Sequence, residues 1–268
     1  MNLTYLKTVF NKDKFENNLA TSWLGRSLFY FEELPSTNNF AKKLKGDGGC
    51  HGTLVLADYQ SRGRGQHEHE WIVEPGLNLT FSLMFQPSNA ERLNLLTLVC
   101  ALSVKDTMEH FTGLEPQIKW PNDVLVNEQK LCGILTETVF VGNKLERVIV
   151  GIGFNVNQSE FKEATVSDAT SLKKETNRGF DRELVLAHLI QDIEYKYRLW
   201  NQRDPELLKK VNNSLSGYGD WIKLKVNGEI LSGKYKFLGA NNNGELVALD
   251  SEMDLKTYAF EQVRVIRA

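Results

Sequence analysis

The alternation of apolar and polar positions along the chain predicts short strands separated by a few amphipathic helices. Continuous apolar runs at residues 53–57 (TLVLA) and 77–85 (LNLTFSLMF) are typical of buried strands, and residues 90–111 carry apolar side chains at helical spacing. Because most strands are joined by short connections, we predict an α+β fold with a mixed or antiparallel sheet and not a Rossmann series. Further strands are predicted at residues 27–32, 124–126, 131–138 and 148–153, and further helices at 38–44, 181–200 and 205–211.

The pattern changes near Ser214, and beyond that residue it indicates only short strands and turns. Two Asn-Gly pairs, at residues 227–228 and 243–244, are strong signals for hairpin turns. We therefore predict a larger domain over residues 1–213, with its core at about residues 27–200, and a small β-barrel over residues 214–268.

Composition and charge argue against several classes of protein. The chain has 268 residues, is 41% hydrophobic and 25% charged, and carries a formal net charge of −2. These are ordinary globular values, and a general nucleic-acid or anionic-membrane binder would carry a basic excess. The longest apolar run is about half the length that a bilayer requires, and charges interrupt the N-terminal residues too often for a secretory signal. We expect a cytoplasmic protein with no nucleic-acid or membrane partner.

Some motif-like patterns are better explained without a function. Residues 228–234 have the spacing of a phosphate-binding loop, but Tyr235 stands where a Ser or Thr must reach magnesium. His67 and His69 could bind a metal from one face of a strand, yet no third ligand is evident, so a solvated loop is the favoured interpretation. The three cysteines match no zinc spacing.

Residues 60–65 (QSRGRG) are harder to explain as scaffold. They follow a predicted buried strand, and two glycines flank Arg64. Glycine lets the backbone approach an anion closely, and a guanidinium can bind that anion with two parallel hydrogen bonds. The segment therefore indicates a candidate anion site.

Residues 119–123 (KWPND) form the second such segment. Pro121 should stiffen the turn and Trp120 anchor it, which would hold the polar side chains of this segment in fixed positions. The following hairpin would bring Lys130 back beside the same opening. Converging cations in a glycine-lined pocket suggest a phosphate-bearing ligand, and Asp123 among them suggests magnesium or a fixed lysine. A salt-bridged surface turn is the alternative without a function.

Together these segments give the chain a resemblance to the biotin–protein ligase family. Five motifs occur in the family's order and with its spacing over about residues 28–197, and the β-rich tail is similar to the family's small SH3-like domain. Five motifs in order are far more specific than any one alone. They are Ser36-Thr37-Asn38, Gln60 with Gly63-Arg64-Gly65 and Trp71, KWPND at 119–123, Lys130-Leu-Cys-Gly133, and Gly151-Ile-Gly153-Phe-Asn155.

The resemblance implies the biotin/lipoate ligase catalytic fold and an enzyme that uses ATP and magnesium. Members activate biotin to biotinyl-5′-AMP and then transfer biotin to a lysine of a biotin carboxyl carrier protein, with no tightly bound prosthetic group. About 27 residues precede the first predicted strand, roughly half of what the DNA-binding helix-turn-helix of repressor-type members needs. We therefore expect the ligase-only class, and the resemblance leaves a homodimer open.

The resemblance also implies roles for individual residues. Cations suit the reaction, because joining a carboxylate to an α-phosphate brings two anions together, which repel by about 4 kcal/mol at 4 Å and an effective dielectric near 20. The implied catalytic residues are Arg64, Lys119 and Lys130. The implied biotin-binding residues are Ser36, Thr37, Asn38, Gln60, Gly63, Arg64, Gly65, Gln66, Lys130 and Gly133. The implied nucleotide-binding residues are Trp71, Lys119, Asn122 and Asn155, and Asp123 is the implied magnesium neighbour.

One segment departs from the family pattern. Many members read G-R-G-R-x-G-x-x-W, whereas Gln66 and Glu68 replace the second arginine and a glycine here. The spacing to Trp71 is kept, so we expect the loop to keep its role. Arg64 should then contribute more to retaining biotinyl-5′-AMP than it does in members with a second arginine. Glu68 should point away from this intermediate.

Two other functions remain open. A lipoate–protein ligase or lipoyl transferase shares the fold, but the KWPND segment and the Gly-Arg-Gly loop favour biotin. A non-catalytic biotin- or nucleotide-binding regulator would keep the pocket and lose the lysines. Lys119 and Lys130 are both present, which favours an enzyme.

Overall fold

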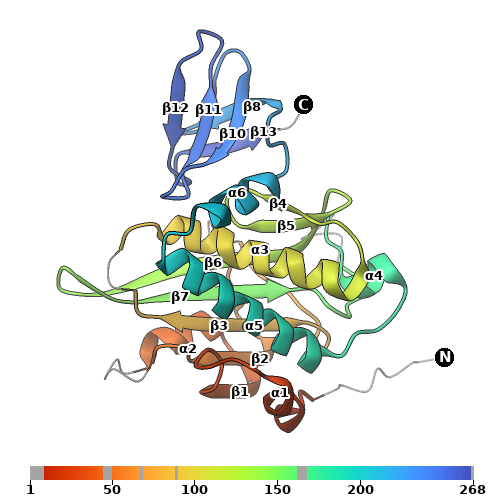
Figure 1. The fold of residues 1–268 in the computed structure, drawn as a ribbon. Helices are drawn as coiled ribbons and strands as arrows, with labels where there is room; N and C mark the ends of the chain where they lie inside the picture. Colours follow the sequence, from red (N-terminus) through yellow and green to blue (C-terminus); the bar gives the residue numbers. More distant parts are fainter. Residues whose placement is uncertain (1–8, 45–49, 67–68, 88–89, 162–167, 267–268) are drawn as a thin grey trace.

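The computed structural model describes residues 9–44, 50–66, 69–87, 90–161 and 168–266. These residues form a large seven-stranded sheet with helices on both faces, and a second, smaller sheet that follows it in the chain (Figure 1). Within the described residues, no helix is long and apolar enough to cross a membrane.

The large sheet has the strand order β1-β2-β3-β7-β6-β5-β4. β1 and β2 are parallel, and the remaining neighbours are antiparallel. The predicted mixed sheet and the predicted meander of three strands are therefore confirmed. The strands are β1 (Leu28–Leu34), β2 (Leu54–Gln60), β3 (Leu79–Phe85), β4 (Gln117–Lys119), β5 (Asp123–Val126), β6 (Gln129–Val141) and β7 (Lys144–Phe154).

Every described helix except α3 begins at a residue whose side chain caps it. The Ser36 hydroxyl accepts from Asn39 N at the start of α2, and the Asp181 carboxylate accepts from Leu184 N at the start of α5. Two short helices, α1 and α4, and the short strand β4 were not predicted. The helices are α1 (Lys12–Asn18), α2 (Thr37–Lys43), α3 (Leu93–Thr112), α4 (Leu172–Thr176), α5 (Arg182–Asn201) and α6 (Pro205–Asn213).

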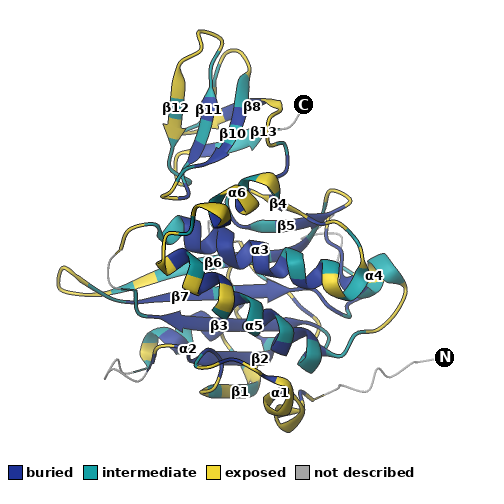
Figure 2. Ribbon diagram, in the orientation of Figure 1, coloured by how far each residue is buried: buried dark blue, intermediate teal, exposed yellow. Residues whose placement is uncertain are grey.

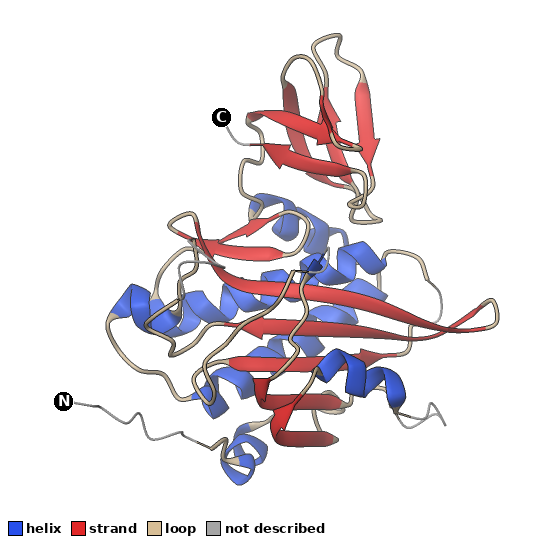
Figure 3. Cartoon of the chain, turned by 180° about the vertical axis from the view of Figure 1, so that it is seen from behind, coloured by secondary structure: helices blue, strands red, loops and turns tan. Residues whose placement is uncertain are grey.

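The two faces of the large sheet carry different helices. α3 and α5 lie over one face, and α2 lies over the opposite face, which Figure 3 shows from the front. Alternation along each strand separates the two cores: Val55, Met84 and Ile149 pack with α2, while their neighbours in sequence pack with α3 and α5. Both sets are buried, and exposed positions lie on the outer helix surfaces, on the turns, and on strands such as β1 and β12 (Figure 2).

The C-terminal strands form a curled antiparallel sheet of order β12-β11-β10-β8-β13, with β9 paired to β8. Asn227 and Gly228 have φ angles of 48° and 91° and join β8 to β9, as their sequence predicts. Asn243 and Gly244 also lie in a hairpin, but in a longer connection than two residues. The strands are β8 (Trp221–Val226), β9 (Glu229–Ile230), β10 (Tyr235–Ala240), β11 (Leu246–Leu249), β12 (Leu255–Tyr258) and β13 (Val263–Ile266).

The small sheet contacts the KWPND turn directly. Trp120 is buried, and its indole N–H donates to the carbonyl of Gly244 at 3.0 Å. Asn212 of α6 pairs with the backbone of Ala240 through both ends of its amide, at 2.8 and 3.1 Å. A side chain at Gly244 would collide with the first turn of α3, so glycine is required for this close approach. The predicted anchoring role of Trp120 is confirmed, and its partner is the C-terminal sheet.

Candidate active site

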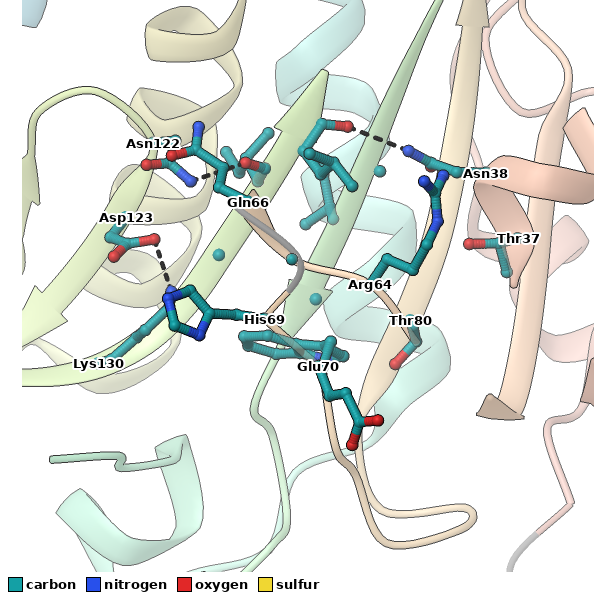
Figure 4. A pocket seen from close by; sticks show the side chains of 18 of the residues that line it. Thr37, Asn38, Arg64, Gln66, His69, Glu70, Thr80, Asn122, Asp123 and Lys130 are labelled. Carbon is teal, nitrogen blue, oxygen red and sulfur yellow. Dashed lines mark hydrogen bonds and ion pairs between the residues drawn. The ribbon is translucent and has the colours of Figure 1, made fainter. Parts of the chain in front are cut away.

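A cavity of about 860 Å³ opens on the face of the large sheet that carries α2 (Figure 4). Its lining includes every predicted site residue except Gly63 and Asn155. The predicted residues in the lining come from the start of α2, the end of β2, the loop after it, the KWPND turn, β5 and β6. The fold therefore gathers segments that lie up to about a hundred positions apart in the sequence around one opening.

Glycines form the floor of the cavity. Gly133 of β6 and Gly153 of β7 are paired across the two strands, and Gly151 lies two residues before Gly153, on the same face. A Cβ at Gly151 would collide with the Asn38 amide, and one at Gly153 would collide with the Trp71 ring. The spacing Gly-x-Gly thus removes side chains where the polar wall and the tryptophan lie against the sheet.

One end of the cavity is neutral, polar and buried. The backbone N–H and the hydroxyl of Thr37 both donate to Gln60 Oε1, at 2.7 and 3.0 Å. The Ser82 hydroxyl lies 2.7 Å from the Thr37 hydroxyl and 2.6 Å from Asn38 Oδ1. These side chains come from α2, β2 and β3, and they hold one another in fixed orientations.

The other end is charged and more open. Lys130 Nζ lies 2.8 Å from Asp123 Oδ1 and 5.7 Å from the centre of the Trp71 ring. Lys119 is exposed and lines both this cavity and a smaller neighbouring hollow of about 380 Å³. Asp123 is therefore paired with a fixed lysine, one of the two partners expected for it.

The loop after β2 folds back on itself at the mouth of the cavity. Trp71 N donates to Gly63 O at 3.0 Å, and Gly65 N donates to His69 O at 2.6 Å. A Cβ at Gly63 would collide with the Trp71 carbonyl, so this glycine is needed for the return of the chain. Trp71 Nε1 is buried and makes no hydrogen bond within the described part of the chain. His67 and Glu68 lie outside the described residues, so the predicted orientation of Glu68 stays a prediction.

Comparison with known proteins identifies the family. Residues 30–155 match the family model for the biotin/lipoate A/B protein ligase family. The chain is 33% identical over 246 residues to the bifunctional ligase/repressor BirA of Bacillus subtilis (strain 168), which covers 90% of this chain and 75% of that protein. This chain belongs to the biotin/lipoate A/B protein ligase family.

Two further relatives lie within the same family. A biotin protein ligase from Aquifex aeolicus, solved in complex with biotin and ATP, superposes with a TM-score of 0.79 at 29% identity, covering 91% of this chain and 100% of that one. The chloroplastic biotin–protein ligase 1 of Arabidopsis thaliana is 23% identical over 257 residues, covering 91% of this chain and 68% of that protein. The likeness therefore extends over both sheets.

The structure places two predicted site residues of this family member away from the cavity. Asn155 is 3% exposed, and its side chain donates to Thr170 O at 3.0 Å. It secures the segment after residue 168 instead of facing the opening, because the chain turns beneath that segment where β7 ends. Gly63 lies behind the loop, against Trp71. Asn122 does line the cavity, but its amide donates to Ile134 O at 2.9 Å and so also fixes the turn.

Several lining or neighbouring residues had no role in the sequence prediction. Gly151 and Gly153 stood in a motif, and their spacing of two on a strand was a usable signal for a bare patch of sheet. Arg264 lines the cavity from β13, where its guanidinium also donates to Phe260 O and Val263 O. Nothing in the local sequence indicates that the C-terminal sheet reaches the site. Glu137, on β6, contacts Arg64 and likewise lacks any local signal.

The described side chains alone offer too few ligands for a magnesium ion, so the phosphates of ATP would have to supply the others. Within the described residues, no group of three or more His, Cys, Asp or Glu side chains could hold a metal. Magnesium commonly binds one or two protein carboxylates together with substrate phosphates. Asp123 offers one carboxylate and is paired with Lys130, so an ion here would rely on the phosphates of ATP for its other ligands.

Proposed function

We propose that this chain activates biotin with ATP to biotinyl-5′-AMP and transfers the biotinyl group to a lysine of a biotin carboxyl carrier protein. One observation carries the proposal: a single cavity joins a buried neutral polar end to a cationic end across a glycine floor. The chain's 33% identity to a bifunctional ligase/repressor supports it.

The neutral end suits the ureido ring of biotin. That ring has no charge but carries hydrogen-bonding groups, and burying them unpaired would cost a few kcal/mol. Thr37, Asn38 and Gln60 are buried side chains that can exchange hydrogen bonds with such a ring. We place the ring at this end, with Ser36 beside it.

The cationic end suits the reacting groups. An oxygen of the biotin carboxylate attacks the α-phosphorus of ATP, the bond from that phosphorus to the bridging oxygen breaks, and pyrophosphate leaves. Lys119 and Lys130, with Arg64, reduce the repulsion between the two anions as they meet. In the second step the carrier amine attacks the acyl carbon, the bond to the phosphate oxygen breaks, AMP leaves and the amine gives up a proton.

We further propose that the two parts of the chain have different roles. Residues 1–213 act as the catalytic domain, and residues 214–268 support it through the Trp120–Gly244 contact. Asp123 would help to hold magnesium that arrives with ATP, and Trp71 would cover the adenylate. The net charge of −2 lacks the basic excess that is typical of a DNA-binding protein.

A comparison of two acids tests the proposed function. Purified protein is incubated with ATP, magnesium and either biotin or lipoate, and pyrophosphate release is followed. A carrier domain and its Lys→Arg acceptor variant are then examined by mass spectrometry. We expect pyrophosphate release with biotin and one biotinyl group on the lysine-containing domain alone. Equal release with lipoate would overturn the substrate assignment, and release with neither acid would overturn the activity.

A further inference from the structure

Glu137 lies beside the neutral end of the cavity and accepts from three donors. Its Oε2 is 2.9 Å from Asn38 Nδ2 and 2.7 Å from Arg64 Nη2. Its Oε1 is 2.7 Å from Lys42 Nζ. The carboxylate therefore joins β6 to α2 and to the loop after β2, and Figure 4 shows Arg64 extending toward Asn38.

The strand register explains why Glu137 reaches this place. Glu137 pairs with Ile149 of β7, and Leu135, two residues earlier, pairs with Gly151. Both positions face α2, because side chains alternate along a strand. Asn38 can lie against Gly151, where it donates to Leu135 O at 3.2 Å as well as to Glu137.

The surroundings keep Glu137 charged. Burial of its carboxyl would raise the pKa, but hydrogen bonds from Lys42, Asn38 and Arg64 outweigh burial and leave the pKa below its ordinary value. The Glu137 side chain is 18% exposed, whereas that of Arg64 is 41% exposed. Without the contact to Glu137, the Arg64 side chain, which is largely open to water, would populate many rotamers.

We propose that Glu137 is a positioning residue for biotin activation, which holds the Arg64 guanidinium at the junction of the two ends of the cavity and couples it to Asn38. This inference rests on the proposed function. A guanidinium has five N–H donors, so the Nη2 contact with Glu137 leaves others to face a substrate carboxylate or phosphate. Arg64 lies between Gly63 and Gly65, whose backbones pair with Trp71 and His69, so the same contact also orients the returning loop.

A purely structural role is the competing explanation, and Lys42 separates the two. Lys42 binds the other carboxylate oxygen and ties the same helix to the same strand, but it does not line the cavity. If Glu137 only fastens α2 to β6, removing the Lys42 contact should do comparable harm. If it positions Arg64, removing the Lys42 contact should matter little.

The test is a double-mutant cycle with four variants: Glu137→Gln, Arg64→Ala, the double variant, and Lys42→Met as control. KM for biotin, KM for ATP and kcat are measured by pyrophosphate release, alongside melting temperatures. We expect Glu137→Gln to raise KM for biotin about tenfold with little change in KM for ATP, as for loss of one charge-assisted contact. The double variant should resemble Arg64→Ala within about twofold, because the two side chains act as one unit. Lys42→Met should change each constant by less than about twofold.

Three results would overturn the proposal: an unchanged KM for biotin in Glu137→Gln, fully additive effects in the double variant, or equal losses in Lys42→Met. If Glu137→Gln does not fold at the assay temperature, Glu137→Asp replaces it in the cycle, because the shorter side chain keeps the charge and loses the 2.7 Å contact with Arg64. Failure of the proposed function would appear separately, as a parent protein that releases no pyrophosphate with biotin.

Discussion

The two ends of the cavity are built differently. At the neutral end, Thr37, Asn38 and Gln60 are all buried before any ligand arrives. Thr37 is hydrogen-bonded to Gln60 directly and linked to Asn38 through the Ser82 hydroxyl. At the cationic end, Lys119 is exposed, and Lys130 pairs with Asp123 through an interaction that a ligand can replace. A neutral ring gains from donors and acceptors fixed in advance, while phosphates gain from charges that are free to reorganise around them. From this contrast we predict that substitutions can impair substrate recognition and chemical activation separately in this site.

Loss of Lys130 should produce the largest effect. Lys130→Ala removes a cation that lies over the glycine floor, and adenylate formation should fall by about a hundredfold to a thousandfold, as for removal of one group that stabilises developing charge. Lys144→Ala, at an exposed position of the β6–β7 hairpin, is the matched control. The measurement is single-turnover pyrophosphate release together with a melting curve. Near-normal release from a natively folded variant would show that Lys130 is placed wrongly.

A methyl group on the floor should have the next largest effect. Gly153→Ala would collide with the Trp71 ring, so biotin activation should fall about tenfold to a hundredfold, in line with the cost of overpacking. Gly179→Ala is the control, because its nearest neighbour would be 3.9 Å away. Displacement of the ring should change tryptophan fluorescence, and this change should vanish in a Trp71→Phe background. Unchanged activity and fluorescence would contradict the described floor.

A change at the neutral end should affect one substrate only. Thr37→Val keeps the shape of the side chain but removes the hydroxyl that donates to Gln60. KM for biotin should rise about tenfold while KM for ATP stays the same, as for one buried hydrogen bond left unpaired. Thr257→Val, at an exposed position of β12, is the control. Equal rises in both KM values would break the separation between the two ends.

The smallest effect should come from weakening the contact between the KWPND turn and the C-terminal sheet. Trp120→Phe removes the hydrogen bond to Gly244 O and should lower stability by about 1 kcal/mol, or about 2–4 °C in melting temperature. KM for ATP should rise about threefold, which corresponds to about half of the 1.4 kcal/mol that a tenfold change represents. Trp221→Phe is the control, since Trp221 is 50% exposed. A rise in KM for biotin without a rise in KM for ATP would contradict the placement of Trp120 behind the cationic end.

The sequence allowed the cations of the site to be predicted, because residue type and chemistry coincide there. Arg64, Lys119 and Lys130 are cations in short motifs that contain glycine or proline, and all three line the cavity. The floor was harder, because Gly133 and Gly153 meet only through the register of β6 and β7. Strand register depends on the whole sheet and cannot be derived from a local pattern.

Other parts of the site depend on tertiary contacts that leave no local trace. Glu137 is an ordinary acidic position in a strand, and only the approach of α2 and the Arg64 loop makes it part of the site. The family resemblance implied a nucleotide-binding role for Asn155, whereas the chain after β7 turns away from the cavity and buries this side chain against Thr170. The short elements α1, β4 and α4 were missed because so few residues give a weak periodic signal.

Isolation of the intermediate tests the central claim most directly. The protein, in excess over α-labelled ATP, is mixed with magnesium and either biotin or lipoate, and protein-bound label is separated and identified. We expect labelled biotinyl-5′-AMP with biotin and no adenylate with lipoate, followed by conversion of the label to AMP when a carrier domain is added. No labelled adenylate with biotin, or equal amounts with both acids, would contradict the assignment of a biotin-selective neutral end joined to a cationic end that activates it.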